Sequence, residues 1–152
     1  METNMPSFQD LFVKSKGQPV TYDGRTIQMV DRLSMADGQT LKVTFEGVDS
    51  DWRQGVGLDT DGSFEVNNQI IKKSIVLWQD TAPREILLKV HTSKGECRVK
   101  NVWDVGDGVI HSWHNGAAMV VEELPNGKRY RCNDGRADDD FDDLLFSIEL
   151  VK

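Results

Sequence analysis

The sequence predicts an all-β protein: an antiparallel β-sandwich of about ten short strands with jelly-roll-like connections. Seven Asp-Gly or Asn-Gly dipeptides are spread along its 152 residues, and such dipeptides supply the positive φ angles that tight hairpins need. Apolar and polar residues alternate in Leu41–Phe45 and Cys97–Val102, the pattern of a sheet with one face in water. Helical periodicity is nearly absent. A barrel is the alternative architecture.

The expected elements follow one another without a linker, so we expect one domain over residues 1–152. A short helix is compatible with the pattern of Phe8–Val13. Each expected strand is a short run containing apolar residues and bounded by turn signals. These strands are Val20–Tyr22, Thr26–Asp31, Thr40–Glu46, Gly55–Leu58, Ser63–Val66, Ser74–Trp78, Glu85–His91, Cys97–Trp103, Ala117–Glu123, Arg129–Cys132 and Leu144–Val151.

Composition argues against several classes of function. No apolar stretch is long enough to span a bilayer, so no membrane partner is expected. Met1–Pro6 lacks a basic start followed by an apolar segment, so we expect no secretory signal and a cytoplasmic location. A net charge of −7 without a basic stripe argues against nucleic acid as a partner. In a reducing compartment Cys97 and Cys132 are expected to be free thiols.

The acidity is concentrated in one segment. Six aspartates lie between Asn133 and Asp143; with Arg136 they contribute −5, which leaves 19 acidic and 17 basic residues in the rest of the chain. Crowding like charges costs Coulomb energy that water only partly screens. The segment is therefore either a solvated acidic loop or a site for a compensating cation or basic partner.

Carboxylates clustered on a bendable segment are what a hard cation such as Ca²⁺ requires, since it takes six to eight oxygen ligands. The candidate metal ligands are Asn133, Asp134, Asp138, Asp140, Asp142 and Asp143. The run Asp138-x-Asp140-Phe141-Asp142-Asp143-Leu144-Leu145-Phe146 resembles a short signature of calcium-associated β-sandwich domains in bacterial surface proteins. The resemblance covers residues 138–146 and implies a bound calcium ion. A second acidic segment, Leu58–Glu65, is interpreted as a β-turn whose Asp caps its own backbone.

A third segment, Asn101–Gly116, places aromatic, imidazole and carboxylate side chains between two expected strands. Aromatic faces with nearby polar tips suit sugar rings and peptides alike. The candidate ligand-binding residues are Trp103, Asp104, Asp107, His111, Trp113 and His114. The alternative is that each Trp fills an end of the sandwich as part of the core.

Catalytic patterns are weak in this sequence. Ser112 is not part of a Gly-x-Ser-x-Gly elbow. A pair of carboxylates of the glycosidase type stays possible, because the sequence does not give the distances between acidic side chains. We therefore expect a non-enzymatic binding module with a calcium-ordered acidic loop and a carbohydrate ligand. The alternative, from another class, is a cytosolic interaction or inhibitor protein, such as an immunity protein, whose acidic patch binds a basic partner.

Overall fold

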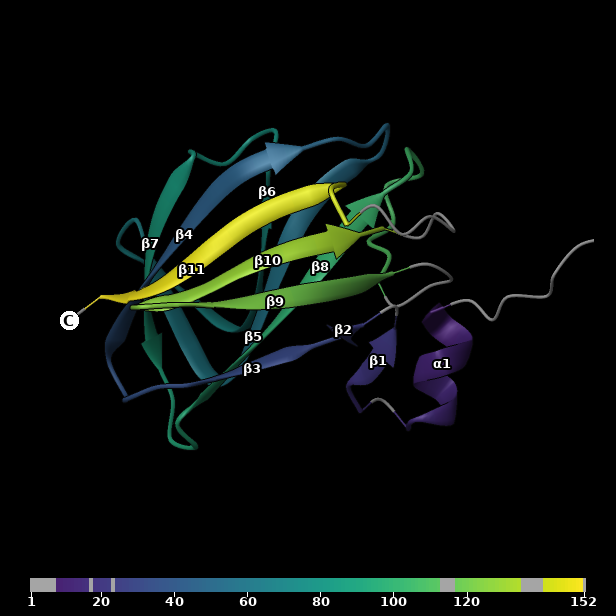
Figure 1. Ribbon diagram of the computed structural model, residues 1–152. Helices are drawn as coiled ribbons and strands as arrows, with labels where there is room; N and C mark the ends of the chain where they lie inside the picture. The colour runs from purple at the N-terminus through teal and green to yellow at the C-terminus, as the bar shows by residue number, and fades with distance from the viewer. Residues whose placement is uncertain (1–7, 17, 23, 113–116, 135–140, 152) are drawn as a thin grey trace, which may run out of the picture.

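The computed structural model describes residues 8–16, 18–22, 24–112, 117–134 and 141–151 (Figure 1). Within them the chain forms one helix and eleven strands, which confirms the prediction of an all-β protein. Their bounds are α1 Phe8–Lys14, β1 Val20–Tyr22, β2 Arg25–Gln28, β3 Asp31–Ser34, β4 Gln39–Val48, β5 Arg53–Val66, β6 Gln69–Trp78, β7 Glu85–His91, β8 Glu96–Asp104, β9 Ala118–Leu124, β10 Gly127–Asn133 and β11 Leu144–Val151.

The strands belong to one antiparallel sheet that curls into a half-barrel (Figure 1). The strand order is β1-β2-β9-β10-β11-β4-β7-β5-β8-β3, and β6 pairs with β5 outside this path. β2 pairs with β9, whereas β3 pairs with β8 at the far end of the order. Only Met29 and Val30 separate β2 from β3. One short piece of chain therefore joins the two ends of the sheet.

β5 corrects two sequence predictions. Gly55–Leu58 and Ser63–Val66, expected as separate strands, are parts of one strand that stays paired with β6 across an irregularity between Asp59 and Ser63. The reversal of the chain occurs later, at Asn67 and Asn68, whose φ angles are 50° and 62°. Asparagine tolerates this left-handed region better than most residues. The sequence does not predict this turn, because Asn67-Asn68 lacks the glycine of the Asp-Gly and Asn-Gly dipeptides.

The Asp61-Gly62 dipeptide is a point of close strand contact rather than a turn. A Cβ atom on Gly62 would lie 2.0 Å from the carbonyl oxygen of His91 in β7. Asp61 accepts hydrogen bonds from the hydroxyl groups of Ser93 and Thr92. Both bonds lower the pKa of the Asp61 carboxyl well below its usual range, and the bond from Ser93 has the larger effect. The Asp61 carboxylate therefore ties β5 to the turn between β7 and β8.

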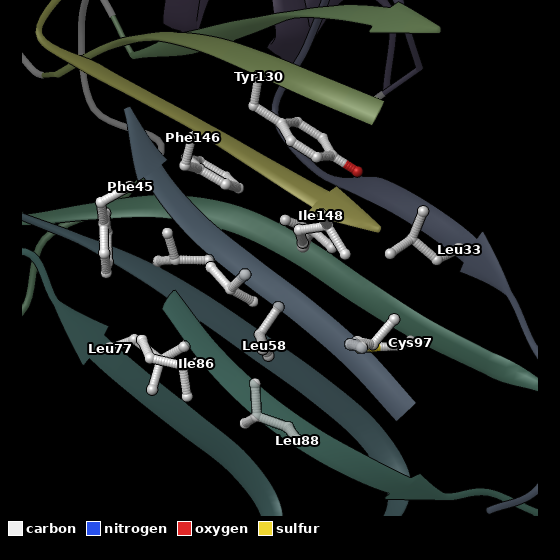
Figure 2. Close-up of a cluster of buried hydrophobic side chains, with 14 of the residues drawn as sticks. Leu33, Phe45, Leu58, Leu77, Ile86, Leu88, Cys97, Tyr130, Phe146 and Ile148 are labelled. Atoms are coloured by element: carbon white, nitrogen blue, oxygen red, sulfur yellow. The ribbon is translucent and has the colours of Figure 1, made fainter. Parts of the chain in front are cut away.

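The main core lies on the concave side of the half-barrel (Figure 2). The rings of Tyr130 and Phe146 stack with centroids 4.7 Å apart, as β10 and β11 place these residues opposite each other. The Tyr130 hydroxyl donates to the buried Asp31 carboxylate at 2.7 Å, and Lys128 Nζ lies 3.0 Å from the same group. These contacts hold the start of β3 against β10, a strand with which β3 does not pair.

Cys97 and Cys132 are both free, buried thiols, as expected. Burial raises the pKa of Cys97 to about 12 and that of Cys132 well above its usual value. Neither thiol has the thiolate character that reactive cysteines need. No helix in the described part of the chain is both long and apolar enough to cross a membrane.

Candidate functional site

The loops at one end of the half-barrel bring together the two segments that the sequence singled out. The end of β10 and the start of β11 flank the acidic segment, and Cys132 pairs there with Leu144. The end of β8 pairs with the start of β5 through Asp104 and Arg53. We call this end the loop rim: residues 49–52, 104–112, 133–134 and 141–143. It lies on the right in Figure 1, where α1 also packs.

Hydrogen bonds close the base of the acidic segment. The Phe141 N–H donates to Asn133 Oδ1 at 2.7 Å, and the Asp134 N–H donates to Asp143 Oδ2 at 2.9 Å. The Asp143 N–H donates to the carbonyl oxygen of Cys132 at 3.1 Å. Two of the predicted calcium ligands, Asn133 and Asp143, thus use side-chain oxygens to join the two stems of the loop.

The Asp134 carboxylate is also engaged by protein donors. Its Oδ2 atom accepts hydrogen bonds from Ser50 Oγ at 2.6 Å and Gln54 Nε2 at 3.0 Å, and the residue is fully buried. Asn101 Nδ2 donates to the Asn133 carbonyl oxygen at 2.7 Å, which links β8 to the same network. Buried hydrogen-bond networks of this kind give rigidity to a polar region, although Gln54 Oε1 is buried here without a hydrogen-bond partner among the described residues.

The calcium site stays a prediction. Asp138 and Asp140 lie outside the described residues, whereas Asp142 is half-buried. Among the described residues, no group of three or more His, Cys, Asp or Glu side chains is arranged to hold a metal ion. Asn133, Asp134 and Asp143 make the hydrogen bonds that join the stems of the loop.

Phe141 anchors the acidic segment to a second, smaller core. Its ring is buried with Phe12 of α1, Ile27 of β2 and Ala118 of β9. The Arg25 guanidinium lies 4.7 Å from the ring centroid, in cation–π geometry. Phe141 also has a φ of 53°, which is uncommon for an aromatic residue. The contacts of the ring hold the backbone in this conformation.

Trp103 occupies the position that the core alternative predicts. It is 2% exposed, and its ring stacks on His111 with centroids 6.3 Å apart. The backbones of Trp103 and His111 exchange two hydrogen bonds, of 3.1 and 2.9 Å. Trp103 is therefore not available as an open platform for a sugar ring. Trp113 and His114 lie outside the described residues.

Two predicted ligand-binding carboxylates order the loop that Trp103 and His111 close. Asp104 Oδ1 accepts from the N–H groups of Gly106 and Gly108, at 2.8 and 3.2 Å. Asp107 Oδ1 accepts from the Val109 N–H at 3.0 Å, and its Oδ2 lies 3.2 Å from His111 Nε2. The bond from Val109 and then that from His111 lower the pKa of Asp107. Both carboxylates fix the local backbone.

This loop presents apolar side chains to solvent. Val109 and Ile110 are each 53% exposed, and Val105 is 42% exposed. These residues are not among the predicted ligand-binding residues, which are all aromatic, imidazole or carboxylate side chains. The available signal was a set of large apolar residues inside a turn rich in Gly and Asp, where such residues have no core to fill.

The loop rim also carries acidic residues. Asp49 and Asp51 follow β4, and Asp142 lies at the other side of the loop rim. Arg53 is held by Asp80 at 2.8 Å and lies over the Trp78 ring. The loop rim therefore combines fixed apolar side chains with excess negative charge.

Comparison with known proteins assigns no family: no family model matches this chain, and no curated protein sequence matches it either.

Proposed function

We propose that this chain is a non-enzymatic binding protein whose loop rim engages a basic protein partner. The observation that carries the proposal is the Val105–Ile110 loop, which exposes three apolar side chains on a backbone fixed by Asp104 and Asp107. Exposed apolar residues on an ordered loop are typical of interaction surfaces.

Order in the free loop favours affinity. Binding costs conformational entropy when a loop must become fixed, and a loop that is already fixed avoids much of that cost. The bridge between Trp103 and His111 closes the base of the loop, and the positive φ angles of Gly106 and Gly108 are held by bonds to Asp104. Val109 and Ile110 are thus presented to a partner in one arrangement.

Negative charge determines the expected chemistry of the partner. Asp49, Asp51 and Asp142 lie on the loop rim, and Asp138, Asp139 and Asp140 lie in the sequence between the two stems of the acidic segment. Complementary charge steers association and excludes acidic competitors. A surface rich in Lys and Arg with an apolar centre matches this arrangement best.

The carbohydrate ligand and the calcium ion rest on sequence patterns alone. The burial of Trp103 removes one of the two aromatic faces on which the carbohydrate hypothesis depended. One carboxylate oxygen of Asp134 and one of Asp143 accept hydrogen bonds from protein donors, which favours a structural role for these residues over calcium binding. Both hypotheses are therefore secondary to a protein partner.

The experiment begins with capture of partners on the immobilised chain, followed by purification of each captured protein and calorimetric measurement of its affinity. The test variant is Val109→Asp with Ile110→Asp. Leu87→Asp is the matched control, because Leu87 is 58% exposed on β7, away from the loop rim. Both positions are exposed, so both variants should fold.

We expect a basic partner whose affinity falls at least about tenfold in the loop variant, is unchanged in the control and weakens with added salt. Binding that survives the loop variant, or that is insensitive to salt, would contradict the proposal. Failure to recover any partner with this behaviour from the cells that produce the chain would also contradict it.

A further inference from the structure

A cleft of about 530 Å³ opens at the end of the half-barrel opposite the loop rim. β2 pairs with β9, but β3, the next strand of the chain, pairs with β8 instead. The sheet is therefore open between β3 and the hairpin of β9 and β10, and the cleft lies in this opening. Leu150 is partly exposed in it, and the nearly buried core residues Leu33 and Ile148 form its apolar base. Figure 1 shows β3 diverging from β9 toward this end.

The strand edge of β3 that faces this cleft has backbone groups available for pairing. Met35 N–H donates to the Gly95 carbonyl, so the alternation of an antiparallel ladder directs the N–H and C=O of Asp31 and Leu33 toward β8. The same alternation directs the N–H and C=O of Arg32 and Ser34 toward the free edge. Arg32 and Ser34 both line the cleft.

The outer face of β3 has an unbalanced charge pattern. Arg32 lies directly opposite Arg98 of β8, and Arg98 lies opposite Asp59 of β5. Like charges at directly opposed positions destabilise a sheet. Arg98 has the Asp59 carboxylate on its other side, whereas the other side of Arg32 is the free edge. The ion pair of Arg32 with Glu96 is long, at 3.9 Å, and both side chains are well exposed, so it compensates little.

We propose that an extended peptide binds in this cleft by pairing with the free edge of β3. An acidic residue of the peptide lies opposite Arg32, which completes a row of acidic, Arg32, Arg98 and Asp59 side chains across the strands. The residues before and after the acidic one point inward and place apolar side chains beside Leu33 and Ile148. This is β-strand addition: main-chain bonds give affinity and alternate side chains give specificity.

The side chains of the cleft favour a peptide over a small amphipathic acid. Lys128, the other cation of the cleft, is already paired with Asp31 at 3.0 Å and lies 3.8 Å from Glu123. A small acid could form an ion pair with Arg32, but it would leave the N–H and C=O groups of Arg32 and Ser34 at the strand edge unpaired. An extended backbone meets both requirements at the two-residue spacing of a strand.

The test uses acetyl-Val-Thr-Val-Glu-Val-Thr-Val-amide as the probe, titrated into the isotope-labelled full chain and followed by NMR and amide hydrogen exchange. Two N-methylated peptides give a matched comparison. A methyl group on the Glu nitrogen removes a donor that faces β3, whereas one on the next Val nitrogen points away from β3. We expect protection of the Arg32 and Ser34 amides by the parent peptide, loss of binding with the Glu methyl and retention with the Val methyl.

Charge reversal supplies the second arm. Replacement of the Glu in the probe by Lys should weaken binding at least about fivefold, and Arg32→Glu should reverse that preference. Arg84→Glu is the matched control, because Arg84 is also exposed but lies outside the cleft. Arg32 is largely exposed, with 71% of its side chain accessible, so its replacement should leave the fold intact.

Three outcomes would overturn the proposal. These are equal binding of the two N-methylated peptides, a peptide preference that is unchanged in Arg32→Glu, and absence of any shift at Arg32 and Ser34 at millimolar peptide. Decanoate serves as the comparison ligand. If decanoate shifts the methyl groups of Leu33 and Ile148 and no peptide protects the β3 amides, the cleft is a site for small amphipathic acids instead.

Discussion

Replacement of Phe141 should show how firmly the acidic segment is attached to the fold. The ring is 1% exposed in the small core with Phe12, Ile27 and Ala118. Truncation of a buried Phe to Ala costs about 3–5 kcal/mol of unfolding free energy, through lost burial and the cavity left behind. For a chain of this size the melting temperature should therefore fall by about 6–20 °C.

The backbone of Phe141 makes a second comparison possible. Its φ of 53° lies in the left-handed region, where an L-residue with a Cβ costs about 1 kcal/mol and glycine does not. Phe141→Gly should therefore be about 1 kcal/mol more stable than Phe141→Ala. At a position with negative φ, the alanine variant would be the more stable of the two, because glycine loses more conformational entropy on folding.

Urea unfolding of the two variants and the parent chain, monitored by Trp fluorescence, measures both differences. The slope of free energy against denaturant should be unchanged, since a truncation alters stability without altering the surface exposed on unfolding. A loss below about 1 kcal/mol for Phe141→Ala, which is typical of a surface site, would refute the anchoring role. An alanine variant more stable than the glycine variant would refute the assigned backbone conformation.

Three further predictions follow from the site and the sheet. Trp103→Ala should destabilise the chain by about 3–5 kcal/mol in chemical unfolding, since the side chain is buried; a near-neutral effect would restore Trp103 as a binding platform. Asp61→Asn should lower the free energy of unfolding at neutral pH. The folded state lowers the pKa of Asp61, so the stability that its carboxylate contributes is present above the unfolded pKa of about 4 and is lost as pH falls toward the folded pKa. Parallel curves of stability against pH for parent and variant between pH 7 and 2 would contradict this. If the acidic segment binds Ca²⁺ with an affinity of about 10⁻⁴–10⁻³ M, 5 mM Ca²⁺ should stabilise the parent by about 1–2.3 kcal/mol, and Asp140→Asn with Asp142→Asn should abolish that gain; identical thermal melts with calcium and with chelator would end the calcium hypothesis.

The sequence predicted the class of fold because hairpin turns and alternation are local signals. Alternation over Leu41–Phe45 and Cys97–Lys100 corresponds to the buried and more exposed faces of β4 and β8, whereas Asn101 and Val102 are both buried. The expected strand Thr26–Asp31 is divided between β2 and the start of β3, and Arg32–Ser34 were not predicted as strand. The inward residue Asp31 is a buried carboxylate, so β3 lacks the apolar alternation that marks a strand. The bonds to Asp31 from Tyr130 and Lys128 come from residues about a hundred positions away, and no local pattern contains them.

The sequence placed its candidate residues in segments that the fold brings to one end of the half-barrel, whereas the contacts of their side chains could not be predicted from it. Asp104, Asp107, Asn133 and Asp143 were chosen for ligands because carboxylates and amides bind cations and sugars. The same groups also satisfy backbone N–H groups in loops, and that use depends on which amides the fold brings near them. Their spacing in the sequence does not distinguish the two uses.

The most direct test of the loop rim as an interaction surface is its footprint in a complex. The partner captured by the parent chain would be added unlabelled to the isotope-labelled chain, and amide signals would be mapped in the free and bound states. We expect shifts and line broadening at Val105, Val109 and Ile110 and at the neighbouring Asp51, with little change at Arg32 on the opposite end. A footprint that leaves Val109 and Ile110 unaffected would contradict the assignment of this loop as the binding surface.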